Sequence, residues 1–277
     1  MILLITHLLL WFNLNNTAPA LHIEKQGQGQ AVLFLPGFTN PGSIWEETAS
    51  NTIPGKTYYY VSYAGFNGLD PIDTPWYDQL KEQLLRYVID NDLKDLIIVG
   101  HSMGGNLAID LAAELPNRID KMILVDALPC MREVMMPQIP AESLSYHSPY
   151  NTQMLQMEST QFNTMAASMA VNMTYKVDKQ KQIAEWIQKA DRKTWVYGYT
   201  DLLKLDQRTI LSKINCPTLI LGADFPNRQQ VEQNFYKQYQ NLQNKKLVIA
   251  PNSKHFVFFD QPEWFGSQIQ QFLNDAP

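Results

Sequence analysis

A serine inside a turn motif is the first feature of this sequence that could do chemistry. The segment Gly100-His101-Ser102-Met103-Gly104 directly follows the apolar run 96–99. The pattern G-x-S-x-G between a buried strand and a helix is typical of a sharp turn that lifts the serine hydroxyl to the edge of a sheet. Glycines leave room for such a turn, and the helix N-terminus behind it favours a developing negative charge. We therefore predict that Ser102 is a nucleophile.

A serine hydroxyl is a weak nucleophile and needs an adjacent base, which histidine most often supplies. Of the five histidines, His101 neighbours the serine, but its side chain is expected to point away and to pack beneath the turn. His255 follows the last strand-like run and precedes the last predicted helix. Asp126 and Asp224 each follow a strand-like run, and either carboxylate could orient an imidazole.

Alternating strand-like and helix-like segments must position these side chains. Apolar, aromatic or β-branched runs occupy residues 31–35, 57–63, 96–99, 122–125, 218–221 and 246–250. Between them, Trp76, Leu80, Leu84 and Val88 recur at every fourth residue, as on one face of an amphipathic helix. This alternation predicts an α/β fold with a mostly parallel central sheet and helices on both faces.

The alternation stops between residues 127 and 216, where helix-like patches and many methionines replace it. We therefore predict a core formed by residues 21–126 and 217–277, with residues 127–216 as a helical insertion.

Composition and charge exclude several function classes for this chain of 277 residues. The net charge of −5 makes it a poor electrostatic partner for nucleic acid. The sequence shows neither a metal-ligand cluster nor a phosphate-binding glycine loop, so we predict no metal and no cofactor. Cys130 and Cys216 fall at opposite ends of adjacent predicted strands, farther apart than a disulfide allows, so we predict two free thiols.

The segment GHSMGG resembles the α/β-hydrolase superfamily, in particular its cap-bearing members of the serine esterase type. LFLPGF at 33–38 and SKHF at 253–256 support this resemblance, which extends over residues 21–273. It implies that His255 is the base, and that the backbone N–H groups of Phe38 and Met103 form an oxyanion hole. The sequence departs from the family pattern at Pro36, where histidine is usual, and at Lys254, where glycine is usual.

Two aspartates are candidates for the acid of the predicted triad with Ser102 and His255. Asp224 stands at the family's common acid position, and the order Ser, Asp, His agrees. One residue separates it from Gly222, whereas the family pattern has two. Some members draw the acid from the strand end where Asp126 lies. The motif spacing favours Asp224, with Asp126 as the alternative. In a non-catalytic role, Asp224 would cap the following helix and Asp126 would bind loop amides.

The resemblance further implies that the insertion is a cap that lies over Ser102 and shapes its pocket. Methionines suit adaptable apolar surfaces, and aromatic side chains in loops above the sheet are further candidates. The predicted pocket residues are Trp45, Phe66, Met131, Met135, Met136 and Met169.

The leading function hypothesis is a serine hydrolase that cleaves a small, fairly apolar carboxylic ester through an acyl-enzyme. The same fold and triad also serve C–C bond hydrolases, lactonases, amidases and aminopeptidases. A hypothesis of another class is a non-catalytic receptor that holds its ligand in the cap pocket.

The first 23 residues carry no acidic or basic side chain. An apolar run at 1–12 precedes Ala18-Pro19-Ala20, a pattern typical of a signal peptide cleaved after Ala20, although the basic start of such peptides is missing. We expect export to the periplasm or the medium if residues 1–20 are a leader, with no stable membrane span after cleavage, and a cytoplasmic protein otherwise. The expected partner is a small ester-like molecule, and the sequence does not indicate an oligomeric state.

Overall fold

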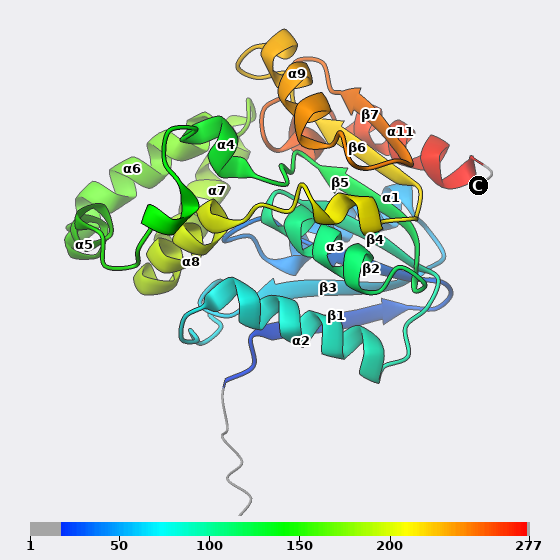
Figure 1. Ribbon diagram of the computed structural model, residues 1–277, viewed down its shortest axis with the longest axis horizontal. Coiled ribbons are helices and arrows are strands. Elements are labelled where there is room, and N and C mark those ends of the chain that lie inside the picture. Colours follow the sequence, from blue (N-terminus) through cyan, green and yellow to red (C-terminus); the bar gives the residue numbers. More distant parts are fainter. Residues whose placement is uncertain (1–17, 276–277) are drawn as a thin grey trace, which may run out of the picture.

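Seven strands form one twisted sheet in the computed structural model, which describes residues 18–275 (Figure 1). The spatial order is β1-β3-β2-β4-β5-β6-β7; β1 pairs antiparallel with β3, and all other neighbours are parallel. The strands are β1 (Leu21–Gly27), β2 (Ala31–Leu35), β3 (Thr57–Tyr63), β4 (Leu96–His101), β5 (Ile119–Val125), β6 (Thr218–Gly222) and β7 (Lys245–Ile249). The predicted mostly parallel α/β sheet is confirmed.

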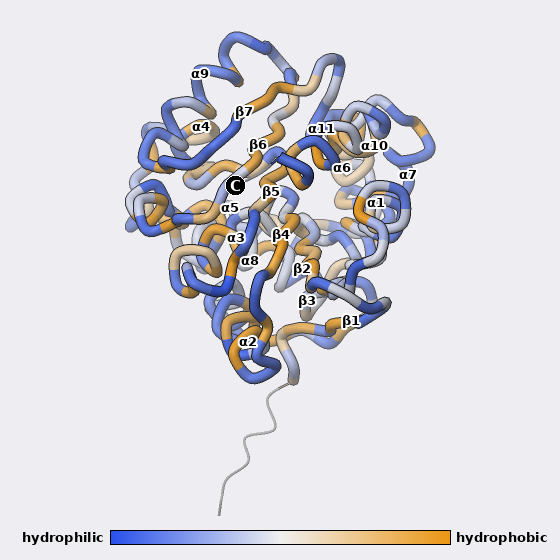
Figure 2. The backbone as a smooth tube through the Cα atoms, turned by 90° about the vertical axis from the view of Figure 1, so that its right-hand side faces the viewer, coloured by the Kyte–Doolittle hydropathy of each residue, from blue (hydrophilic) through white to orange (hydrophobic). Residues whose placement is uncertain are grey.

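Helices cover both faces of this sheet. Helices α2 (Trp76–Asp90) and α3 (Met103–Glu114) pack on one face, and α1 (Glu46–Thr52) and α11 (Pro262–Asn274) pack together on the other. Helix α9 (Arg228–Gln238) contacts β6 and β7, and the short helices η1 (Gly42–Trp45) and α10 (Val257–Asp260) complete the core. Figure 2 shows hydrophobic strands in the middle, between helices whose outward residues are hydrophilic.

The unbroken apolar run at residues 96–99 forms part of the central strand β4. All six of its residues are buried, because neighbouring strands flank it and helices cover it from both sides. The predicted stripe on α2 is also observed, since its residues at every fourth position, Trp76, Leu80, Leu84 and Val88, are buried.

The segment between β5 and β6 is helical and lies at the end of the sheet where the parallel strands finish (Figure 1). It contains α4 (Met131–Met135), η2 (Ala141–Ser143), α5 (Pro149–Gln156), α6 (Ser159–Val171), α7 (Val177–Lys189), α8 (Arg192–Lys204) and η3 (Ile210–Lys213). Asp201 of α8 accepts hydrogen bonds from the backbone N–H groups of Trp76 (2.9 Å) and Tyr77 (3.2 Å), and so caps the start of α2. These bonds fix the helical segment to the core.

Most of the predicted leader, residues 1–17, lies outside the described residues. Ala20 is described and is buried. Its N–H donates to Gln83 (2.8 Å), and its carbonyl accepts from the N–H of Ala64 (2.9 Å). Cleavage after Ala20 would remove both hydrogen bonds. Among the helices of residues 18–275, none combines the length and the apolar character that crossing a bilayer requires.

Cys130 and Cys216 are both free, as predicted from their places beyond opposite ends of neighbouring strands, and both are buried. Burial raises the pKa of the Cys216 thiol to about 11, because the low-polarity surroundings disfavour the thiolate.

Candidate functional site

Ser102 stands on a strained turn between β4 and α3. Its backbone has φ 52° and ψ −121°, a conformation that non-glycine residues rarely adopt. Its N–H donates to the carbonyl of Val125 on the neighbouring strand at 2.9 Å, which holds the turn against the sheet. A Cβ on Gly104 would overlap the carbonyl oxygen of Leu35, so glycine is required there for the close approach of α3 to β2. This is the geometry that the G-x-S-x-G motif predicts.

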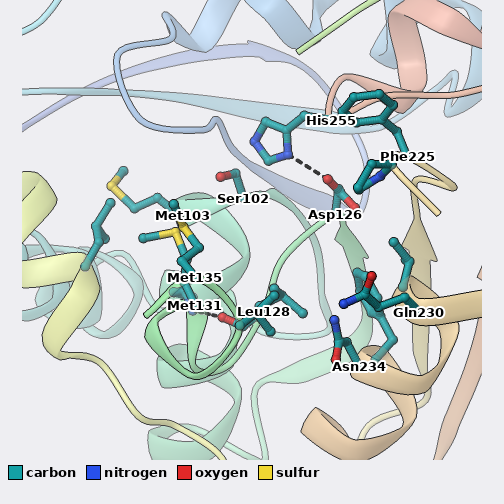
Figure 3. Close-up of a pocket in the computed structure, with 16 residues that line it drawn as sticks. Ser102, Met103, Asp126, Leu128, Met131, Met135, Phe225, Gln230, Asn234 and His255 are labelled. Atoms are coloured by element: carbon teal, nitrogen blue, oxygen red, sulfur yellow. Dashed lines mark hydrogen bonds and ion pairs between the residues drawn. The ribbon is translucent and has the colours of Figure 1, made fainter. Parts of the chain in front are cut away.

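His255 and Asp126 form a close hydrogen-bonded pair beside Ser102. The imidazole Nδ1 lies 2.6 Å from the Asp126 Oδ2, and Figure 3 shows this contact with Ser102 next to the ring. The other Asp126 oxygen accepts a hydrogen bond from the N–H of Ala223 at 3.0 Å. Both partners are mostly shielded from solvent, with side-chain exposures of 28% for the histidine and 17% for the aspartate. The pairing fixes the ring orientation and directs its Nε2 away from the carboxylate.

The geometry corrects the spacing-based preference for Asp224 as the partner of His255. Asp224 instead accepts hydrogen bonds from the backbone N–H groups of Asn252 (2.8 Å) and Ser253 (3.0 Å). The reason is the strand order: β5, which ends just before Asp126, lies directly beside β4, whereas β6 is one strand farther away. The Asp224 carboxylate supports the loop that carries the histidine but does not touch the ring.

His101 packs beneath the site, as expected from its place before the serine. Its Nε2 lies 3.0 Å from the carbonyl oxygen of His255 and therefore carries the proton, because a carbonyl only accepts. Burial holds the pKa of His101 well below its usual range, so the ring is neutral. The two imidazole centroids are 4.5 Å apart. His101 therefore supports the backbone of the neighbouring loop.

Of the two predicted oxyanion donors, Met103 directly follows the serine, and Phe38 lines the smaller of two cavities that also contain Ser102. Met103 is the first residue of α3, and Phe38 follows β2. Neither N–H group has an acceptor within residues 18–275. The Phe38 ring packs edge-on against Phe66 (4.9 Å) and Trp76 (5.6 Å), which fixes the loop that carries its amide. A donor to a bound oxyanion needs such an N–H group without an acceptor in the protein.

Two cavities meet at Ser102 and His255. The larger, of about 370 Å³, lies toward α4 and α9, and the smaller, of about 160 Å³, lies toward α6, α7 and α8. Met131 and Leu202 line both cavities and stand where they join. The walls are largely apolar, and α9 adds two amide side chains, Gln230 and Asn234, to the larger cavity (Figure 3). The site therefore has two largely apolar compartments that meet at the serine.

The predicted pocket residues separate into two groups. Met131 and Met135 line the larger cavity and Met169 the smaller one, whereas Met136 lines neither. Trp45 and Phe66 are fully buried in the core. Those two predictions are corrected because the loops after β2 and β3 turn inward. The Trp45 ring packs against Phe258 (4.8 Å) and the Phe66 ring against Trp76 (5.3 Å).

Other lining residues were not predicted from the sequence. The larger cavity also takes its walls from Leu128, Val134, Leu202 and Phe225 and from α9, and the smaller one from Met173, Ile183, Ile187, Trp195 and Tyr199. The spacing of Gln230 and Asn234, four residues apart on one helix, was the available signal for a shared direction. Within the described chain, no three side chains of His, Cys, Asp or Glu gather as a metal site.

Comparisons with known proteins agree with this fold. The model of the alpha/beta hydrolase family matches residues 32–267. A pimeloyl-[acyl-carrier protein] methyl ester esterase of Nitrosospira multiformis is 23% identical over 258 residues, which cover 91% of this chain and 98% of that protein. A non-heme chloroperoxidase of Kitasatospora aureofaciens is 24% identical over 263 residues, covering 90% and 94%.

Among solved structures, an esterase from Exiguobacterium antarcticum matches with a TM-score of 0.76 and 19% identity, covering 94% of this chain and 99% of that one. At this identity the structural match speaks for the fold alone. The family model, by contrast, spans most of the chain and includes Ser102, Asp126 and His255. The chain therefore belongs to the alpha/beta hydrolase family.

Proposed function

We propose that the protein is a serine hydrolase that cleaves a small, fairly apolar carboxylic ester through an acyl-enzyme. The observation that carries the proposal is the arrangement of Ser102 on its strained turn beside a histidine whose Nδ1 is held by Asp126. Together these side chains provide a nucleophile, a base and a group that orients the base. The relatives named as methyl ester esterases support an ester as the substrate.

In the proposed mechanism, the Ser102 oxygen attacks the ester carbonyl while His255 Nε2 accepts the hydroxyl proton. Asp126 stabilises the imidazolium that forms, without taking the proton itself. The oxyanion of the tetrahedral intermediate accepts hydrogen bonds from the Phe38 and Met103 N–H groups. The imidazolium then protonates the leaving alcohol, and a water molecule activated by the same base hydrolyses the acyl-enzyme.

The unequal cavities support a substrate with one short part and one longer part. The smaller cavity, about 160 Å³, has room for a short apolar group, and the larger one, about 370 Å³, for a longer chain. The helical segment between β5 and β6 supplies walls to both cavities, and we propose that it serves as a cap over the serine.

A panel of nitrophenyl and methyl esters of increasing acyl length tests this proposal on the purified protein. We expect turnover of short to medium esters, with activity falling for acyl chains too long for the larger cavity, and none from Ser102→Ala. Parallel arms with lactones, anilides and vinylogous diketones distinguish lactonase, amidase and C–C hydrolase activity. Activity confined to one of those arms would replace the ester proposal, and tight ligand binding without turnover would favour a receptor.

A further inference from the structure

The loop that carries His255 has backbone hydrogen bonds on both sides of the histidine, one to the helical segment and one to α10. The N–H of Phe256 donates to the carbonyl of Met173 at 3.0 Å, in the α6–α7 connection, residues 172–176. The N–H of Lys254 donates to Asp260 Oδ2 at 2.8 Å. Both neighbours of the proposed base are thus tied by their backbone.

Asp260 joins the loop to the α6–α7 connection through its second oxygen. Its Oδ1 accepts from the Thr174 hydroxyl at 2.6 Å and from the Tyr175 N–H at 2.8 Å. Thr174 is fully buried, and Asp260 is only 7% exposed. Hydrogen bonds to a carboxylate that is shielded from water are among the stronger ones in a protein, so this bridge is a firm one.

Lys254 adds a third link through its side chain. Its ammonium donates to the carbonyl of Val171, the last residue of α6, at 2.7 Å, and so caps the negative end of that helix. The same ammonium lies 4.5 Å from the ring centre of Tyr175 and 5.0 Å from that of Phe225, which lines the larger cavity. The lysine is only 8% exposed, so its ammonium interacts with these protein groups rather than with solvent.

We propose that Lys254 and Asp260 are positioning residues that hold the His255 loop and the α6–α7 connection together as one unit. Met169 of α6 and Met173 of the connection line the smaller cavity, so the helices that enclose one part of the substrate also set where the base stands. This inference rests on the proposed function of His255. It gives the lysine a role that a glycine at this position could not have.

Kinetics of Lys254→Met and Asp260→Asn test the proposal, with Lys176→Met as a matched control. Lys176 is an exposed lysine of the same connection, and its side chain makes no hydrogen bond or ion pair within residues 18–275. We expect kcat to fall about 10- to 100-fold in the first two variants with KM nearly unchanged, because a misplaced base slows the chemistry while the cavities persist. The control should stay within about twofold of the wild type.

Conservative variants separate positioning from simple stability. Lys254→Arg keeps a cation for the Val171 carbonyl, and Thr174→Ser keeps the hydroxyl that donates to Asp260, whereas Thr174→Val removes it. Rescue of kcat by the arginine and serine variants, and faster amide exchange at Phe256 in the impaired ones, are the expected results. If Asp260→Asn does not fold, the Thr174 pair provides the same comparison.

Folded variants of Lys254 and Asp260 that keep the wild-type kcat would overturn the proposal, as would an equal loss in the Lys176 control. Failure of the proposed function is distinguishable, because the wild-type protein itself would then lack ester turnover.

Discussion

Replacement of Asp126 by Asn is the most informative perturbation of the site. It changes which imidazole nitrogen carries the proton and leaves the volume of the side chain almost unchanged. In the wild type, one carboxylate oxygen accepts from the Ala223 N–H at 3.0 Å, and the other lies 2.6 Å from His255 Nδ1. In the variant, the amide oxygen can keep the Ala223 bond, which turns the NH₂ group toward the imidazole. Nδ1 must then act as an acceptor, and the ring proton moves to Nε2.

A ring protonated at Nε2 cannot accept the Ser102 proton, so the variant loses its base while its cavities remain. We expect kcat for a nitrophenyl ester to fall by about 10⁴-fold, equivalent to about 5 kcal/mol of barrier, with KM changed little. Stopped-flow or steady-state assays of nitrophenol release measure this fall in kcat, and denaturant unfolding confirms that the variant is folded.

Asp224→Asn is the matched control, because the same chemical change is made one strand away. Its amide oxygen can still accept one of the two loop N–H groups, from Asn252 or Ser253, and the loss of the other costs about 1–3 kcal/mol of stability. We expect its kcat to stay within about tenfold of the wild type. The reasoning is refuted if kcat falls by thousands-fold in Asp224→Asn while Asp126→Asn remains nearly as active as the wild type.

Three further predictions follow from packing. Gly104→Ala is expected to lower the free energy of unfolding in urea by about 3 kcal/mol, because its Cβ overlaps the Leu35 carbonyl; unchanged stability would contradict the close approach of α3. Met131→Ala is expected to join the two cavities and to raise the ratio of kcat/KM for branched esters to that for straight-chain esters by about tenfold. An unchanged ratio would show that Met131 does not separate the two cavities. Cys130 and Cys216 should resist a thiol reagent at pH 8 and react fully after denaturation, because both are buried and the pKa of Cys216 is raised to about 11; rapid labelling of the native protein would contradict this burial.

The sequence predicted the sheet and the serine turn well, because both depend on local patterns. Apolar runs mark the buried strands, and the glycines around Ser102 mark the close approach of a helix to a sheet. The partner of His255 was harder to predict, since Asp126 and Asp224 both end strands of the same sheet. Only the spatial order of β4, β5 and β6 shows which carboxylate lies nearer.

The pocket walls were predicted only in part, for a related reason. Met131, Met135 and Met169 were found by composition, whereas Trp45 and Phe66 were misplaced because an aromatic residue in a loop can turn inward as readily as outward. The bonds from the Lys254 ammonium to Val171 and from Thr174 to Asp260 join segments more than 80 residues apart, so no local pattern reveals them.

Labelling with a biotinylated fluorophosphonate tests the central claim most directly, because this probe reacts much faster with a serine that has an adjacent base than with an ordinary hydroxyl. The account predicts one adduct per chain in the intact mass spectrum, on the peptide that contains Ser102, with loss of ester hydrolysis in step with labelling and no adduct on Ser102→Ala. Labelling of Ser102→Ala at the wild-type rate, or full hydrolysis by a protein already labelled at Ser102, would contradict it.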